Sequence, residues 1–285
     1  MATTIAEALL QAAQVLRKAG VVEARREAGS LLSFVIKRDR TALISHAEDL
    51  LVSDQITHFT KLVERRALGE PLHYITGKQD FYGREFTVTP AVLIPRPETE
   101  LLVEVALEKL IALQSPRICD VGTGSGCIAV SLLCERQDAH VTALDISPAA
   151  LDVARMNASD QGVLERIVFQ TSDLFKSLNS EQDCFDLVVS NPPYIADGAI
   201  QTLQREVREH EPLMALASGV DGLDHIRRLL LDTPQFLKPR GHLIIEIGFD
   251  QSGLLKNTID NIVWELLEIR PDLQGIPRIA VLRKS

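Results

Sequence analysis

From Ser115 onward, short apolar runs alternate with helical segments, and this alternation limits the possible folds more than any other feature. The runs that predict strands are Ile118–Val121, His140–Leu144, Ile167–Gln170, Phe185–Ser190 and Leu243–Glu246. The intervening helices pass through Val130 and Leu133, begin at Pro148, and span about Leu223–Leu237. Such alternation favours right-handed crossovers and a parallel sheet covered on both faces.

The end of the chain departs from this alternation. Trp264–Arg270 and Arg278–Arg283 read as strands, and only a short segment with Pro271, Gly275 and Pro277 separates them. Strands joined so closely must be antiparallel. We therefore expect an α/β fold with a mostly parallel sheet and an antiparallel C-terminal strand.

The residues before this domain divide into two parts. Residues 1–72 carry apolar stripes at helical spacing, such as Ile5, Leu9 and Leu16, and predict a small helical bundle. Residues 73–95 interleave aromatic residues with glycines and predict a β-hairpin linker. Residues 96–285 then form the larger domain, which begins with a helix over about Glu98–Leu113.

A glycine-rich loop follows the first predicted strand of the larger domain. It comprises Asp120, Val121, Gly122, Thr123, Gly124, Ser125 and Gly126. Glycines allow a sharp turn and a close approach to a ligand, and the following helix offers free backbone amides. The dinucleotide fingerprint needs its third glycine one place later, where this chain has Cys127. A nucleoside without a pyrophosphate is therefore favoured over a nicotinamide cofactor.

Polar residues close four different strands of the predicted sheet. They are Asp120, Asp145, Asp173 and Asn191. In open α/β sheets, ligands bind beyond the carboxyl ends of the strands, so these side chains should surround one crevice. Asp145 lies 19 residues after Gly126 and could accept hydrogen bonds from both ribose hydroxyls. Asp173 could accept one from an adenine amino group, and Leu174 could cover the ring.

Asn191, Pro192, Pro193 and Tyr194 follow the fourth strand and are the candidate acceptor site. An amide or aromatic amine is a poor nucleophile because its lone pair is conjugated, so an enzyme must hold it in place. The Asn191 side-chain oxygen and the Pro192 carbonyl could accept one N–H each, and Tyr194 could stack on the planar group. Asn191, Pro192 and Tyr194 are thus the candidate catalytic residues, and they would contribute mainly orientation.

Composition excludes several other classes of protein. The four cysteines form no close pair and the seven histidines form no metal-binding pattern, so we expect no metal. No apolar run is long enough for a membrane helix and no secretory signal is recognised, so we expect a cytoplasmic protein. Residues 91–285 hold 18 Lys and Arg against 28 Asp and Glu, a poor match for nucleic acid.

The motifs together resemble those of a known family. The Asp120–Gly126 loop, Asp145 and the Asn191–Tyr194 segment resemble class I, Rossmann-like methyltransferases that methylate nitrogen. Further similarity lies at the sequence Ile-Pro-Arg-Pro-Glu-Thr-Glu of residues 94–100, and at Arg65-Arg66, Gly69-Glu70-Pro71, Glu211-Pro212 and Gly275-Ile276-Pro277-Arg278. Over essentially its whole length, the chain resembles the release factor glutamine methyltransferases, also called the HemK or PrmC family.

The resemblance implies a reaction, a cofactor and a partner. The reaction is transfer of methyl from S-adenosylmethionine to the side-chain N5 of the glutamine in the Gly-Gly-Gln motif of peptide-chain release factors, which leaves S-adenosylhomocysteine. The family holds the nucleoside with the residues that match Gly122–Gly126, Asp145 and Leu174, and the glutamine with those that match Asn191–Tyr194. Its N-terminal bundle helps to grip the release factor. Many members have an aromatic residue where this chain has Leu174, so adenine stacking is the feature in question. We expect a monomer that binds neither nucleic acid nor membrane.

Three other functions are alternatives to this one. A nucleic-acid methyltransferase acting on adenine or guanine amino groups would share the crevice chemistry, but it should carry a basic surface and a base-flipping region. A nicotinamide-dependent oxidoreductase conflicts with Cys127 and with the Asn-Pro-Pro-Tyr segment. A binding module without catalysis would not need a polar residue at every strand end.

Overall fold

The computed structural model describes residues 3–285 and divides the chain into two compact units. The first unit runs as far as Lys78 and also takes in Gln204–His210. The second unit comprises Gln79–Leu203 and Glu211–Ser285. The expected division at residue 72 lies close to the first boundary, but no sequence pattern predicted that residues 204–210 belong with the bundle.

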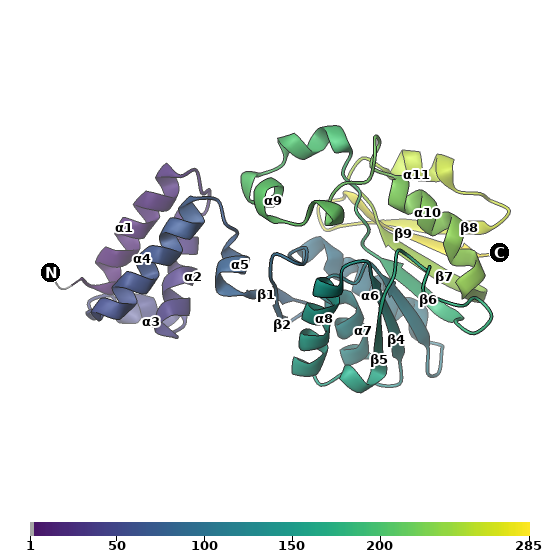
Figure 1. Cartoon of the computed structure of the whole chain (residues 1–285), viewed down its shortest axis with the longest axis horizontal. Helices are drawn as coiled ribbons and strands as arrows, with labels where there is room; N and C mark the ends of the chain where they lie inside the picture. The colour runs from purple at the N-terminus through teal and green to yellow at the C-terminus, as the bar shows by residue number, and fades with distance from the viewer. Residues whose placement is uncertain (1–2) are drawn as a thin grey trace. The chain divides into compact units, whose positions relative to one another are not determined.

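The first unit is helical, as the apolar stripes predicted. Its helices are α1 (Ile5–Lys18), α2 (Ala24–Ile36), α3 (Arg40–Ser45), α4 (Ser53–Ala67), α5 (Leu72–Thr76) and α9 (Arg205–His210) (Figure 1). Leu16, Leu31 and Leu32 are fully buried in its core. Thr4 begins α1 with a capping box, because its side chain accepts from Glu7 N while the Glu7 carboxylate accepts from Thr4 N.

A buried arginine connects three helices of this unit. The side chain of Arg66 on α4 is 8% exposed, and its guanidinium lies 2.5 Å from Glu27 on α2 and 2.6 Å from Glu206 on α9. A buried guanidinium is tolerated only when it is paired. Arg66 therefore depends on the carboxylates of Glu27 and Glu206. This pairing explains why α9 belongs to the bundle although it is far away in the sequence.

The linker contains the predicted hairpin but begins with a helix that the sequence analysis did not predict. Strands β1 (Lys78–Phe81) and β2 (Arg84–Thr87) form the two-stranded sheet. Residues 73–76, expected within the hairpin, belong instead to α5. Gly77 ends α5 in the left-handed region, with φ 75°, and Tyr74 and Ile75 are buried on the helix. The prediction was wrong here because a glycine can mark the C-terminus of a helix as well as a turn between strands.

The second unit contains a seven-stranded sheet in the order β5-β4-β3-β6-β7-β9-β8. Its strands are β3 (Arg117–Val121), β4 (His140–Asp145), β5 (Ile167–Thr171), β6 (Phe185–Ser190), β7 (Leu237–Glu246), β8 (Trp264–Pro271) and β9 (Pro277–Lys284). Strands β5, β4, β3, β6 and β7 pair in parallel, and β9 is antiparallel to both β7 and β8. The predicted mostly parallel α/β sheet with an antiparallel C-terminal strand is confirmed.

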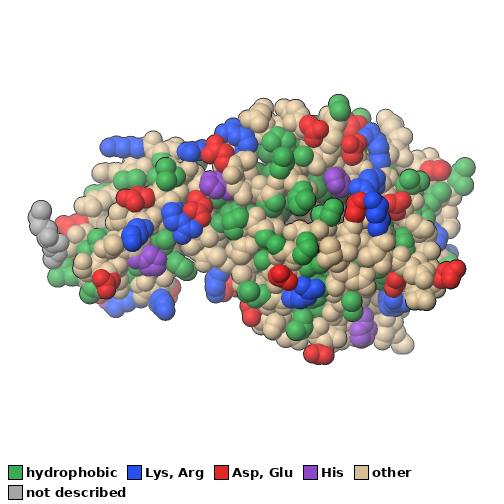
Figure 2. Space-filling view, in the orientation of Figure 1, with side chains coloured by type: hydrophobic (Ala, Val, Ile, Leu, Met, Phe, Trp, Pro, Cys, Tyr) green, Lys and Arg blue, Asp and Glu red, His purple; other side chains and the backbone are tan. Residues whose placement is uncertain are grey.

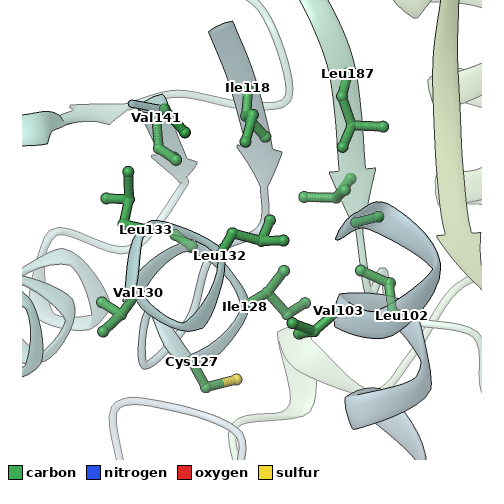
Figure 3. Close-up of a cluster of buried hydrophobic side chains, with 14 of the residues drawn as sticks. Leu102, Val103, Ile118, Cys127, Ile128, Val130, Leu132, Leu133, Val141 and Leu187 are labelled. Atoms are coloured by element: carbon green, nitrogen blue, oxygen red, sulfur yellow. The ribbon is translucent and has the colours of Figure 1, made fainter. Parts of the chain in front are cut away.

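Helices cover both faces of this sheet (Figure 1). One face packs against α6 (Glu100–Leu110), α7 (Cys127–Glu135) and α8 (Pro148–Asp160), and the other against α10 (Asp224–Asp232) and α11 (Ser252–Thr258). Alternate strand residues pack into the two hydrophobic cores on opposite faces of the sheet. Ile118 belongs to the first core and Cys119 to the second. Figure 3 shows Leu132 and Leu133 of α7 directed toward the strand residues of the first core.

Short 3-10 turns complete the second unit. They are η1 (Pro97–Thr99), η2 (Leu164–Arg166), η3 (Asp197–Thr202), η4 (Leu213–Ala215) and η5 (Thr233–Phe236). The helix expected over Glu98–Leu113 is divided into η1 and α6 and ends at Leu110. The helix expected to reach Leu237 ends at Asp232, because Pro234 lacks the N–H that α10 would need to continue. β7 begins at Leu237, whereas the sequence predicted a strand only from Leu243. Within residues 3–285, no helix is both long and apolar enough to cross a bilayer.

Candidate active site

The glycine-rich loop connects β3 to α7 and is held against the neighbouring strand. The backbone N–H groups of Gly122 and Thr123 both donate to the Leu144 carbonyl, at 2.8 and 2.9 Å. Gly122 and Gly124 have φ values of 74° and 55°, and a Cβ on either would project into open space. The loop therefore presents bare backbone to the cleft, where a ligand can approach closely.

Asp120 supports this loop from behind. It is fully buried and accepts a 2.7 Å hydrogen bond from the Thr123 hydroxyl. Burial raises the pKa of Asp120 to about 7, although the Thr123 hydroxyl opposes the shift. Thr123 and Ser125 line the cleft, whereas Asp120 and Gly126 are not among the residues that line it. Gly126 instead packs on α8, where a Cβ would lie 3.1 Å from that of Ala154.

Asp145 is the last residue of β4 and lines the same cleft. One carboxylate oxygen accepts from Gly124 N and the other from Ser147 N, each at 2.9 Å. Burial raises the pKa of Asp145, and these backbone donors oppose the change. A carboxylate oxygen can accept more than one hydrogen bond, so each retains capacity for a ligand hydroxyl.

Asp173 and Leu174 follow β5 and also line the cleft. The Asp173 carboxylate lies between Lys176 (2.7 Å) and Arg228 (2.6 Å), which lower its pKa. Leu174 has φ 51°, in the left-handed region that leucine rarely adopts. Such backbone conformations are often found beside binding sites.

The Asn191–Tyr194 segment begins where β6 ends. The Ser190 hydroxyl donates to the Val121 carbonyl at 2.7 Å and ties this end of β6 to the start of the glycine-rich loop. Asn191, Pro192 and Pro193 line the cleft. Tyr194 is not among the lining residues, and its hydroxyl lies 3.4 Å from a carboxylate oxygen of Glu246.

The cleft thus joins the two regions that the sequence analysis singled out. It has an empty volume of about 1070 Å³, including its opening to solvent. From the candidate site residues, the structure brings together Gly122, Thr123, Gly124, Ser125, Asp145, Asp173, Leu174, Asn191, Pro192 and Pro193. These residues come from the carboxyl ends of β3, β4, β5 and β6, as the strand-end rule predicts.

Two polar residues beside Asn191 were missed by the sequence analysis. Thr99 ends η1 and is 2% exposed, and Glu246 ends β7 and is 1% exposed. The Asn191 side-chain NH₂ donates to the Thr99 hydroxyl at 3.0 Å, and that hydroxyl donates to Glu246 at 2.7 Å. Applied to the fifth strand, the strand-end rule would have indicated Glu246. Thr99 could not be indicated in this way, because it does not follow a strand.

The structure shows no metal-binding arrangement among residues 3–285, where no three His, Cys, Asp or Glu side chains are grouped to hold an ion. All four cysteines are free thiols.

Comparison with known proteins identifies the family. The family model for the PrmC N-terminal domain matches residues 7–77, and that for the methyltransferase small domain matches residues 97–211. A release factor glutamine methyltransferase of Koribacter versatilis is 40% identical over 281 residues, covering 99% of each chain. Another, from Nitratidesulfovibrio vulgaris, is 40% identical over 284 residues, covering 99% of this chain and 96% of the relative.

A solved structure shares the fold. A methyltransferase from Pyrococcus furiosus superposes with a TM-score of 0.51 at 14% identity, over 80% of this chain and 98% of that one. The sequence similarity to the two relatives extends over both units and far exceeds what a shared fold alone requires. The chain belongs to the family of release factor glutamine methyltransferases.

Proposed function

We propose that the cleft binds S-adenosylmethionine beside a glutamine side chain of a peptide-chain release factor, and that the enzyme methylates N5 of the glutamine in the Gly-Gly-Gln motif. One observation carries the proposal: the glycine-rich loop and Asn191 line a single cleft, with β6 tied to the loop through Ser190 and Val121. Donor and acceptor can then lie side by side, as direct transfer requires.

The part of the cleft beside the glycine-rich loop, where the methyl donor would bind, fits a nucleoside. Open space over Gly122 and Gly124 admits a ligand against the backbone. Asp145 retains acceptor capacity for ribose hydroxyls, and Leu174 offers an apolar side chain to the base. Asp173 is already bound by two cations, so it would accept an adenine amino group only through its remaining lone pairs. When bound, S-adenosylmethionine supplies an electrophilic methyl group on a sulfonium sulfur.

The acceptor half fits a primary amide. Within residues 3–285, the Asn191 side-chain oxygen makes no hydrogen bond, because the contact to Thr99 uses the NH₂ group. That oxygen and the Pro192 carbonyl would each accept one N–H of the glutamine amide, which directs the nitrogen toward the methyl group. Bringing the two reactants together in this way can lower a barrier by about 7–11 kcal/mol at best. Stacking by Tyr194 stays a prediction, since this ring is not among the residues lining the cleft.

Surface charge argues against nucleic acid as the acceptor. Residues 91–285 carry a net charge of −10, from 18 basic and 28 acidic residues. The face of the molecule drawn in Figure 2 has acidic and basic side chains interspersed. Nucleic-acid binding depends on clustered basic residues that replace counterions around phosphates.

Mass spectrometry of the products tests the proposal. A release factor incubated with the enzyme and S-adenosylmethionine should gain one methyl group on the glutamine of Gly-Gly-Gln, and a factor with that glutamine changed to glutamate should gain none. If the enzyme binds S-adenosylmethionine but leaves the release factor unmodified, the assignment of the substrate is refuted.

The Asn191→Ala variant tests the acceptor site. It should bind S-adenosylmethionine with wild-type affinity in calorimetry and transfer no detectable methyl, because one of the two amide acceptors is gone. Asn261→Ala is the matched control, since Asn261 is an exposed asparagine before β8. Wild-type turnover in Asn191→Ala would remove the acceptor-site assignment.

A further inference from the structure

A buried chain of hydrogen bonds leads from the candidate acceptor site to the end of β7. It runs from the Asn191 amide to the Thr99 hydroxyl and then to the Glu246 carboxylate. We propose that Glu246, acting through Thr99, fixes which end of the Asn191 amide faces the substrate, so that the oxygen and not the NH₂ group meets the glutamine. This inference rests on the proposed function and assigns Thr99 and Glu246 as positioning residues for it.

The polarity of the chain follows from counting hydrogens. An ionised carboxylate can only accept, so Thr99 must donate its single hydroxyl hydrogen to Glu246. The Thr99 oxygen then has only lone pairs to offer to Asn191. The Asn191 side chain must present its NH₂ group to Thr99, as observed at 3.0 Å. Its oxygen is therefore left on the other side of the amide.

A flipped Asn191 amide would be penalised twice. Its oxygen would face the Thr99 oxygen with no hydrogen between them, and a buried Thr99 would lose a partner. Its NH₂ group would also point at an incoming amide that itself offers N–H donors. Because Asn and Gln amides are nearly symmetrical in shape, packing alone distinguishes the two states poorly, and the hydrogen-bond chain supplies the distinction.

Burial strengthens the preference of these hydrogen bonds for one orientation of the Asn191 amide. Thr99 is 2% exposed and Glu246 is 1% exposed, so water cannot readily replace either partner. Hydrogen bonds in such surroundings are electrostatically stronger than in water. The Tyr194 hydroxyl lies 3.4 Å from the second Glu246 oxygen, a long contact that adds a weak donor. Both carboxylate oxygens thus face hydroxyl groups of residues at the acceptor site.

The direction of these hydrogen bonds depends on pH, because it depends on the charge of Glu246. Burial raises the pKa of Glu246 to about 7, while the Thr99 hydroxyl, Arg278 on β9 and the Tyr194 hydroxyl oppose the shift and Glu98 on η1 adds to it. A protonated Glu246 could donate to Thr99, which would then be free to donate to the Asn191 oxygen. Turnover should therefore fall as pH drops below about 7.

The pair Thr99→Val and Thr99→Ser separates hydrogen bonding from packing. Valine keeps the shape but removes the hydroxyl, so kcat on a release factor should fall about 100-fold, as for a misplaced reactant. The KM and the calorimetric Kd for S-adenosylmethionine should not change. Serine keeps the hydroxyl and should recover most of the lost kcat. Equal losses in both variants, or wild-type kcat in Thr99→Val, would overturn the proposal.

Glu246→Gln tests the other end of the chain and does not depend on Thr99 variants folding. The glutamine amide can accept from Thr99 through its oxygen or donate to it through its NH₂ group, so the polarity is no longer fixed. We expect kcat to fall while the fluorescence of buried Trp264 is unchanged. The decline in kcat on the acid side of the pH profile, which we expect for the wild type, should be absent from this variant. An unchanged decline or an unchanged kcat would overturn the proposal. If the wild-type enzyme methylates the glutamine and Thr99→Val is fully active, the proposed function stands and only the positioning role is removed. If the wild-type enzyme is inactive on the glutamine, both proposals are overturned.

Discussion

Relative to wild type, the Glu246→Gln variant should gain stability in the second unit as pH rises, although its turnover is impaired. The Glu246 carboxyl is fully buried, and its pKa is raised from 4.5 to about 7, chiefly by burial. A raised folded-state pKa means that the folded protein binds the proton more tightly than the unfolded chain does. The stability from this group is therefore fully present below pH 4.5 and is lost as pH rises through about 7.

The size of the effect follows from the shift. One pKa unit corresponds to about 1.4 kcal/mol, so the whole displacement amounts to about 3 kcal/mol. Most of that window lies between pH 5.5 and 8, where the linked loss is about 2 kcal/mol. Glutamine does not titrate, so the free energy of unfolding of Glu246→Gln, relative to wild type, should rise by this amount over the same interval.

Urea unfolding at pH 5.5 and pH 8 measures this difference. Trp264 is the single tryptophan of the chain, and it is buried in the second unit with its indole N–H bonded to the Leu230 carbonyl at 2.9 Å. Its fluorescence therefore reports on that unit. Asp120 also has a pKa raised to about 7, but subtraction of the wild-type curve removes its contribution. A stability difference that is the same at both pH values would refute the reasoning about Glu246.

Two further variants test other parts of the molecule. Asp145→Ala should weaken S-adenosylmethionine binding, because hydrogen bonds to a charged acceptor contribute roughly 1.5–3 kcal/mol each, and calorimetry that finds wild-type affinity would exclude a ribose-binding role. Arg66→Met should speed hydrogen–deuterium exchange in α4 and α9 without altering β3–β6, since removing one partner of a buried ion pair costs about 3–5 kcal/mol. Arg26→Met, at an exposed pair with Glu23, is its matched control and should change exchange little; equal effects of the two would contradict the role given to Arg66.

Much of the catalytic fold was predictable because its signals are local. The apolar run Phe185–Ser190 is bounded by Asn191 and Pro192, and the observed β6 has the same limits. Asp145 was recognisable as a strand-end acid because a helix-starting Pro148 follows closely. The antiparallel ending followed from the short segment between Arg270 and Arg278, which leaves no room for a crossover.

What escaped prediction depends on contacts between distant parts of the chain. Thr99 meets Glu246 across 147 residues of sequence, and nothing near either residue indicates the other. The strand-end rule could have indicated Glu246 as a site residue, but only the sheet order, with β7 beside β6, places it near Asn191. The membership of α9 in the first unit rests on Glu206 reaching Arg66, which local patterns cannot show.

The inclusion of Gln204–His210 in the first unit has a practical consequence for dissecting this enzyme. The polypeptide passes between the units after Lys78, after Leu203 and again after His210, so a single cut cannot separate them. A fragment beginning at Gln79 would carry α9 without the arginine that pairs with Glu206. Chimeras that exchange the bundle between relatives should therefore exchange this short helix with it, as a matched set.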